Sequence, residues 1–208
     1  MKIRMPFGKS FLETTISDDR IAGVITSNLD RYERQESEIE IIKMAMERPH
    51  GSCRLEELSK GKNKVVIIAS DHTRPVPSRF ILPLMLEEIK RGNPNAEVTI
   101  LVATGCHRAT TQNELNEKFG KEMVKRVPIM IHDCDDEEQA FLGILPSGGE
   151  LFINKTAAEA DLLVAEGFIE PHFFAGYSGG RKSVLPGIAS RRTVYANHCA
   201  EFIADPMA

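Results

Sequence analysis

The chain has 208 residues, of which 42% are hydrophobic and 27% charged, and its formal net charge at pH 7 is −4. These values are typical of a globular domain with a sizeable core, and the slight negative charge argues against nucleic-acid or anionic-membrane partners. No apolar run is long enough to span a bilayer, and the first residues lack a signal-peptide core. We therefore expect a cytoplasmic protein.

Four cysteines are scattered along the chain, and no two of them form a CxxC pair: Cys53, Cys106, Cys134 and Cys199. In a reducing cytosol such cysteines are expected to be free thiols. The sequence assigns them no role.

The N-terminal part of the chain predicts a β-hairpin and then a helix. Residues 2–16 alternate around a turn at Gly8-Lys9, as the strands of a hairpin do. Apolar residues recur with helical spacing over residues 37–49, and Pro49 ends that pattern.

From residue 64 onward, short β-branched apolar runs alternate with amphipathic segments. The expected strands are 64–70, 97–105, 127–133 and 160–169, the expected helices are 77–92 and 110–120, and a second hairpin is expected at 141–154. In the second helix, Glu114 is spaced for a capping box with Thr110 or Thr111. The alternation predicts an α/β fold: a mostly parallel twisted sheet with flanking helices, preceded by the N-terminal β-hairpin.

Polar and titratable residues follow each predicted strand, where ligands bind in open α/β sheets. The segments are "DHTR" from residue 71, "TGCHR" from residue 104, "HDCDD" from residue 132 and "EGFIEPHFFAGYSGGRKS" from residue 166. Because parallel strands end at the same edge, these segments predict a binding site there.

The first two segments hold candidate ligand-binding groups. Arg74 can pair with a carboxylate or phosphate, and Asp71 could hold a ribose hydroxyl or orient Arg74. The plainer alternative is a helix-capping aspartate beside a solvated arginine. His107 follows the flexible Gly105 and could transfer a proton or bind a metal, or it could be an ordinary surface histidine.

The last segment is the richest in candidate residues. His172 precedes two phenylalanines, which could form a dry wall that lowers the histidine pKa, although a partly buried core histidine would have the same neighbours. "GYSGGRKS" offers backbone N–H groups and Lys182 to a phosphate but lacks P-loop spacing. Lys182 could also be a nucleophile if burial lowers its pKa, or a solvated lysine at a helix start.

Two further features have weaker signals. His198 lies on a predicted helix and matters only if it faces the same pocket as Lys182. The acidic run could bind a hard cation through Asp133, Asp135 and Asp136, but an acidic surface turn is the simpler interpretation.

Four motifs in this order, "SDHTRPVPS", "TGCHR", "EPHFFAGYSGGRKSVLPGI" and "ANH", resemble the amino-terminal domain of the lactate racemase family. The resemblance spans roughly residues 64–198. It implies a cofactor, the nickel(II)-pyridinium-3,5-bisthiocarboxylate mononucleotide, known as the nickel-pincer nucleotide.

The resemblance also implies roles for individual residues. Lys182 would tether the cofactor, His198 would ligate nickel, and His107 and His172 would be opposing acid/base groups. Arg74 would lie near the substrate, and the remaining cofactor-binding residues would be Asp71, His72, Thr73, Arg74, Ser178, Gly179 and Gly180.

The implied activity is racemisation or epimerisation of a 2-hydroxy acid, lactate or a related acid, by transient hydride transfer to the tethered cofactor. Family members have a second domain, so we expect residues 1–208 to be a cofactor-binding catalytic domain truncated from a longer protein and inactive alone. The expected partners are a C-terminal domain, the 2-hydroxy acid and cofactor-synthesis enzymes. Two alternatives remain: a nickel- or nucleotide-binding module without turnover, and a Schiff-base lyase that uses Lys182.

Overall fold

The computed structural model describes residues 1–204, and the chain divides into two compact units, Met1–Ser37 and Glu38–Ala208. In the first unit β1 (Lys2–Phe7) and β2 (Ser10–Thr15) pair antiparallel around Gly8-Lys9, which confirms the predicted hairpin. Two short 3₁₀ helices follow at Asp18–Arg20 and Asn28–Arg31.

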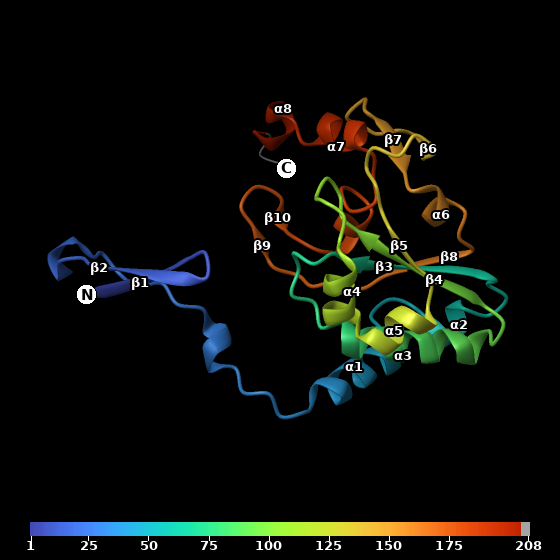
Figure 1. Ribbon diagram of the computed structural model, residues 1–208, viewed down its shortest axis with the longest axis horizontal. Helices are drawn as coiled ribbons and strands as arrows, with labels where there is room; N and C mark the ends of the chain where they lie inside the picture. Colours follow the sequence, from blue (N-terminus) through green and yellow to red (C-terminus); the bar gives the residue numbers. More distant parts are fainter. Residues whose placement is uncertain (205–208) are drawn as a thin grey trace. The chain divides into compact units, whose positions relative to one another are not determined.

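The second unit is built on a four-stranded parallel sheet in the order β5-β4-β3-β8 (Figure 1). Its strands are β3 (Lys64–Ser70), β4 (Glu97–Ala103), β5 (Ile129–Ile131) and β8 (Leu162–Ala165). All four predicted strands are confirmed, and the fold is the expected α/β class.

The central strand β3 is buried on both faces. Val65 and Ile67 belong to a core that includes α3 residues such as Leu82, whereas Val66 and Ile68 belong to a second core on the opposite face. Burial on both faces explains the continuous apolar run, since a strand with one wet face would alternate.

Helices α1, α2, α3 and α5 gather below one face of the sheet in Figure 1. The helices of the unit are α1 (Glu38–Glu47), α2 (Leu55–Leu58), α3 (Ser78–Gly92), α4 (Gln112–Phe119), α5 (Lys121–Arg126), α6 (Lys155–Ala158), α7 (Arg191–Asn197) and α8 (Ala200–Ile203). Thr111 caps α4 and forms a capping box with Glu114, as the spacing predicts.

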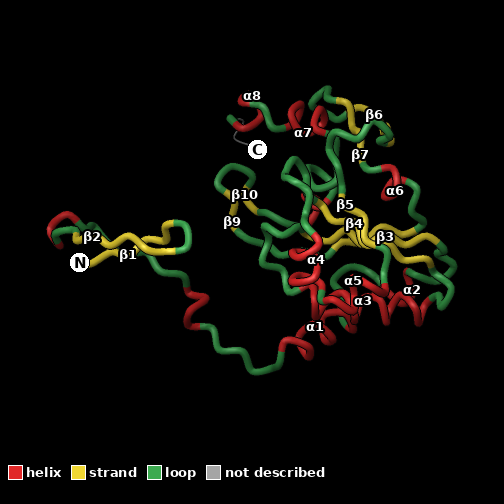
Figure 2. The backbone as a smooth tube through the Cα atoms, viewed as in Figure 1, coloured by secondary structure: helices red, strands yellow, loops and turns green. Residues whose placement is uncertain are grey.

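The other face of the sheet packs against a mixture of hairpin, helix and loop residues, among them Ile153, Ala157 and Ile188. The predicted second hairpin is present as β6 (Ala140–Ile144) and β7 (Glu150–Ile153). Between β8 and α7 the chain is mostly loop (Figure 2), with only the two-residue strands β9 (Pro171–His172) and β10 (Gly176–Tyr177) and a 3₁₀ turn at Gly180–Ser183.

The connections reverse direction beside β3. The chain runs outward from β3 through β4 to β5 and then returns to place β8 on the other side of β3. A crevice forms at such a reversal, outside the carboxyl ends of the strands, and ligands bind there in open α/β sheets. Among the described residues no helix combines the length and apolar character needed to cross a bilayer.

Candidate functional site

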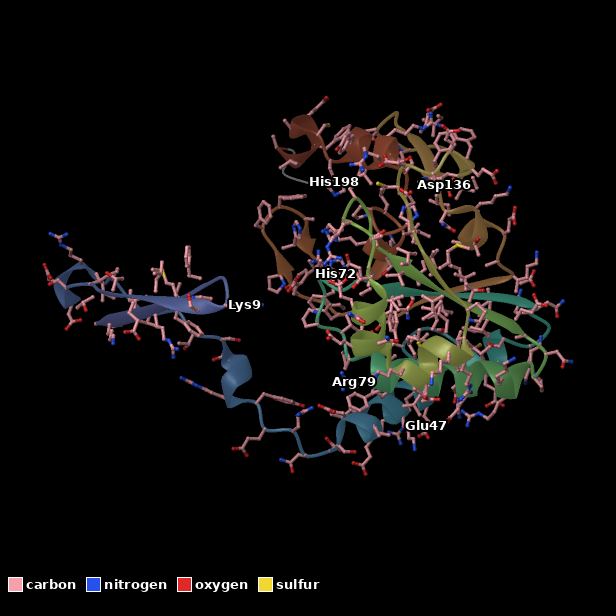
Figure 3. The ribbon with its side chains drawn as sticks, viewed as in Figure 1. Lys9, Glu47, His72, Arg79, Asp136 and His198 are labelled. Atoms are coloured by element: carbon pink, nitrogen blue, oxygen red, sulfur yellow. The ribbon has the colours of Figure 1, made fainter. Side chains whose placement is uncertain are left out.

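A cavity of about 280 Å³ lies at this carboxyl edge. Its walls come from the loops after β3, β4 and β8 and from the end of α7. In Figure 3, His72 marks the loop after β3 and His198 marks the end of α7. Eight of the predicted site residues line the cavity: Asp71, Arg74, His107, His172, Ser178, Gly179, Lys182 and His198.

Asp71 and His107 form a hydrogen-bonded pair at the floor of the cavity. Nδ1 of His107 lies 2.7 Å from Oδ2 of Asp71, which is 1% exposed. Burial alone would raise the pKa of Asp71, but hydrogen bonds from Thr73 and His107 outweigh it and hold the pKa below its ordinary value. Asp71 is therefore an ionised acceptor, and His107 donates its Nδ1–H.

Three predicted cofactor-binding residues lie outside the lining of the cavity. Thr73 contacts the site indirectly, because its hydroxyl donates to Oδ1 of Asp71 and accepts from Arg74. His72 Nδ1 lies 3.0 Å from Oγ1 of Thr110. Gly180 borders open space, since a Cβ added there would meet nothing within 4 Å. Asp71 thus orients His107, and it reaches Arg74 only through Thr73.

His172 lies among aromatic rings. It stacks on Phe173 with centroids 5.0 Å apart and meets the edge of Phe174 at 4.5 Å. Its Nδ1 accepts the backbone N–H of Ala175 at 3.3 Å. Burial and the positive charge of Lys182 lower the pKa of His172, in the direction that the aromatic sequence predicts.

Phe174 is a central residue of the site that sequence reasoning did not single out. Its ring lies 4.5 Å from that of His172, 6.2 Å from that of His198 and 5.9 Å from Nζ of Lys182. The aromatic pair in the sequence was the available signal. Only the fold shows that Phe174 lines the cavity while Phe173 is 93% exposed.

Lys182 and His198 meet the condition that the sequence set for them, because both line the same cavity. Burial and then the charge of Arg74 lower the pKa of Lys182. His198 is not on a helix as predicted: it immediately follows α7, with φ −100° and ψ 50°. Helical periodicity cannot locate the last residue of a helix, so the error is one of boundary.

The glycine-rich segment is closely packed against Phe168, in the loop that follows β8. Gly179 has φ +89°, and a Cβ added there would lie 2.3 Å from the backbone oxygen of Phe168. Only glycine allows this approach.

The acidic run forms a surface turn outside the cavity. Asp133, Cys134 and Asp135 offer ligand atoms within 4.8 Å of one another, but Asp135 accepts both Nε and Nη2 of Arg191 at 2.7 Å. This pairing supports the structural interpretation of the run. All four cysteines are free thiols.

Residues 7–208 match the family model of the lactate racemase N-terminal domain. The chain belongs to this family. It is 55% identical to the lactate racemase of Thermoanaerobacterium thermosaccharolyticum and 50% identical to that of Lactiplantibacillus plantarum, each over 207 residues. Each match covers 99% of this chain and 49% of the relative, so the chain spans about half the length of these curated relatives.

Two solved structures resemble this chain, and one of them is a lactate racemase. The lactate racemase apoprotein of Thermoanaerobacterium thermosaccharolyticum superposes with a TM-score of 0.88 at 54% identity, over 99% of this chain and 48% of that one. A Thermotoga maritima protein gives a TM-score of 0.63 at 26% identity, over 79% of this chain and 41% of that one. The resemblance drawn from the four motifs is confirmed.

Proposed function

We propose that the chain is the cofactor-binding catalytic half of a racemase or epimerase of 2-hydroxy acids, acting on lactate or a related acid. One observation carries the proposal. In a member of the lactate racemase N-terminal domain family, one cavity is lined by three histidines, an arginine and a lysine that come from four separate segments of the chain.

The residues of the cavity fit the nickel-pincer nucleotide. Nδ1 of His198 is buried without a hydrogen-bond partner among the described residues, which suits a metal ligand, and imidazole is a good ligand for nickel. The lowered pKa of Lys182 increases its neutral, nucleophilic form, as covalent attachment of a cofactor requires. Lys182 would hold the nucleotide and His198 its nickel. When bound, the cofactor would supply reversible acceptance of a hydride from the substrate's α-carbon.

The hydrogen bonds of His107 and His172 place the proton of the neutral ring on different nitrogens. His107 donates Nδ1–H to Asp71, which leaves its Nε2 as a proton acceptor. His172 accepts from Ala175 at Nδ1, which leaves its neutral ring with the proton on Nε2. His107 is therefore set to take the substrate's hydroxyl proton, and His172 presents an N–H to the substrate oxygen; to return a proton to that oxygen, His172 must first take up a second proton, so that it ends as a neutral ring.

The two histidines also enter the cavity from different sides of the central strand. His107 follows β4 and His172 follows β8, and these strands flank β3. In racemisation by this route the planar 2-keto intermediate turns over, so its oxygen would face a different side of the cavity before and after the turn, and two separate imidazoles meet that need. Arg74, with its exposed guanidinium at the rim, would hold the substrate carboxylate during the exchange.

The proposal is tested on a complete protein that includes the half present in its relatives, made together with cofactor-synthesis enzymes. We expect a covalent adduct on Lys182, about one nickel per chain, and interconversion of the two enantiomers of a 2-hydroxy acid. Lys182→Ala should lose adduct, nickel and activity, whereas Lys121→Ala, at an exposed position on α5, should keep all three. A loaded protein that interconverts no 2-hydroxy acid would refute the proposal.

The same preparation separates the two alternatives. Stoichiometric nickel without turnover would favour a binding module. The lowered pKa of Lys182 also suits a Schiff base, so borohydride in the presence of a 2-keto acid tests for a lyase. Under the racemase proposal, reduction traps no substrate on Lys182.

A further inference from the structure

The segment from Ser70 to Ser78 carries Asp71 and Arg74 to the cavity. It begins at the last residue of β3 and ends at the first residue of α3. Between those ends it contains no regular helix or strand. The position of both site residues therefore depends on whatever holds this segment.

One carboxylate oxygen holds both ends of the segment. Oε1 of Glu166 accepts the backbone N–H of Ser70 at 3.0 Å and the hydroxyl of Ser78 at 3.0 Å. Glu166 itself follows β8 and is fixed to the sheet, because its N–H donates to Ile68 at 2.9 Å. A single side chain from the adjacent strand thus closes the loop at its base.

A lysine holds the middle of the segment. Nζ of Lys118, on the last turn of α4, donates to the backbone oxygen of Arg74 at 2.8 Å. Burial lowers the pKa of Lys118, and the charges of Glu166 and Asp71 oppose that effect. Lys118 therefore lies in the field of the carboxylate at the base of the loop and of the carboxylate that orients His107.

Glu166 is a buried residue with a carboxylate oxygen that is unpaired within the described chain, which is unusual for a glutamate. Glu166 is 5% exposed, and its second oxygen, Oε2, is buried without a hydrogen-bond partner among residues 1–204. A carboxylate oxygen that is buried without a partner lowers the stability of the fold, so a leucine at this position would be expected to stabilise the core more. Glu166 is not among the residues that line the cavity, and its side-chain hydrogen bonds go to the two ends of this segment.

We propose that Glu166 and Lys118 are positioning residues that clamp residues 70–78, Glu166 at the two ends and Lys118 at the middle, and thereby place Asp71 and Arg74 in the cavity. The geometric part of this inference stands on the hydrogen bonds alone. Its catalytic consequence rests on the proposed function.

The first test detects the clamp by a measurement that does not depend on enzyme activity. In the complete protein, hydrogen–deuterium exchange of the peptide covering 70–78 should be faster in Glu166→Leu than in the wild type, by at least about tenfold in rate. Glu166→Gln keeps an acceptor oxygen for Ser70 and Ser78, so its exchange should match the wild type. If the peptide 70–78 exchanges at the same rate in Glu166→Leu and in Glu166→Gln, the clamp does not exist. Should the Leu variant fail to fold, Ser78→Ala removes one of the two end contacts and decides the question.

The second test uses steady-state kinetics to distinguish the effect of Glu166, at the two ends of residues 70–78, from that of Lys118 at the middle. Glu166→Leu should lower kcat about 10- to 100-fold through misplacement of Asp71, and Glu166→Gln should restore it. Lys118→Met should raise KM for the 2-hydroxy acid about tenfold through misplacement of Arg74, with kcat changed less. Lys121→Met is the matched control and should leave both constants unchanged.

The two proposals fail differently. A wild-type protein without racemase activity would remove the proposed function, while the exchange measurement would still decide the clamp. Wild-type kinetics in Glu166→Leu and Lys118→Met, in an active protein, would overturn the positioning role alone.

Discussion

Nδ1 of His107 donates a hydrogen bond of 2.7 Å to Oδ2 of Asp71, a carboxylate that is buried and held ionised by its neighbours. The pair joins the loops after β3 and β4 and fixes which nitrogen of the neutral His107 ring carries the proton.

Asp71→Asn should lower kcat of the complete, loaded protein by about 100-fold, because the imidazole loses the charge and acceptor that fix its tautomer. Enantiomer interconversion measured by chiral chromatography checks this. Asp136→Asn, on the acidic surface turn outside the cavity, is the control and should retain wild-type turnover. Equal rates for the Asp71 variant and the wild type would show that the pair plays no part in proton transfer.

The depressed pKa of Asp71 also predicts how stability depends on pH. Below the ordinary aspartate pKa of about 3.9 the unfolded chain takes up this proton before the folded chain does. The contribution of Asp71 is therefore complete above that pH and is lost as the pH falls through the lower, folded pKa. Urea midpoints between pH 6 and 2.5 should fall less steeply for Asp71→Asn than for the wild type, and parallel curves would contradict the assignment.

Lys182 should be unusually reactive toward amine reagents. Its lowered pKa gives a larger neutral fraction at pH 8, so a limiting acylating reagent should modify Lys182 before the exposed Lys121. Peptide mass spectrometry gives the order of modification. Arg74→Gln removes the nearby positive charge and should slow the labelling of Lys182. Labelling that is no faster at Lys182 than at Lys121 would count against its role as a tether.

Gly179 and Gly180 provide a matched pair of substitutions. Both have positive φ, and Gly179 also has ψ −169°, a backbone region that is almost restricted to glycine, so alanine costs about 1–3 kcal/mol of backbone strain at Gly179 and about 1–2 kcal/mol at Gly180. At Gly179 the new Cβ would also meet the backbone of Phe168 at 2.3 Å, whereas at Gly180 it would meet nothing within 4 Å. Gly179→Ala should therefore lower the free energy of unfolding more than Gly180→Ala, and only Gly179→Ala should reduce adduct formation on Lys182. Equal effects would show that the Phe168 contact is unimportant.

Much of the sheet could be predicted from sequence because strand burial leaves a local signal. Residues 65–69 are all apolar because neighbours cover both faces of β3. Elements of four to six residues, such as α2 and α5, are too short for a periodicity to stand out, and the two-residue strands β9 and β10 leave none. Glu166 was visible as a charge directly after the apolar residues of β8, but its partners were not.

The residues that follow each strand can be read in order from the sequence, and the loops after parallel strands lie at one edge of the sheet, so most of the chemical groups at the site were predictable. Which of these groups touch one another became clear from the three-dimensional arrangement. His107 forms a hydrogen bond with Asp71, 36 positions away in the sequence. Phe174 lines the cavity whereas Phe173 is exposed. Glu166 accepts hydrogen bonds from both Ser70 and Ser78. These relations depend on the strand order and on side-chain packing between distant segments, and neither is encoded in any local pattern.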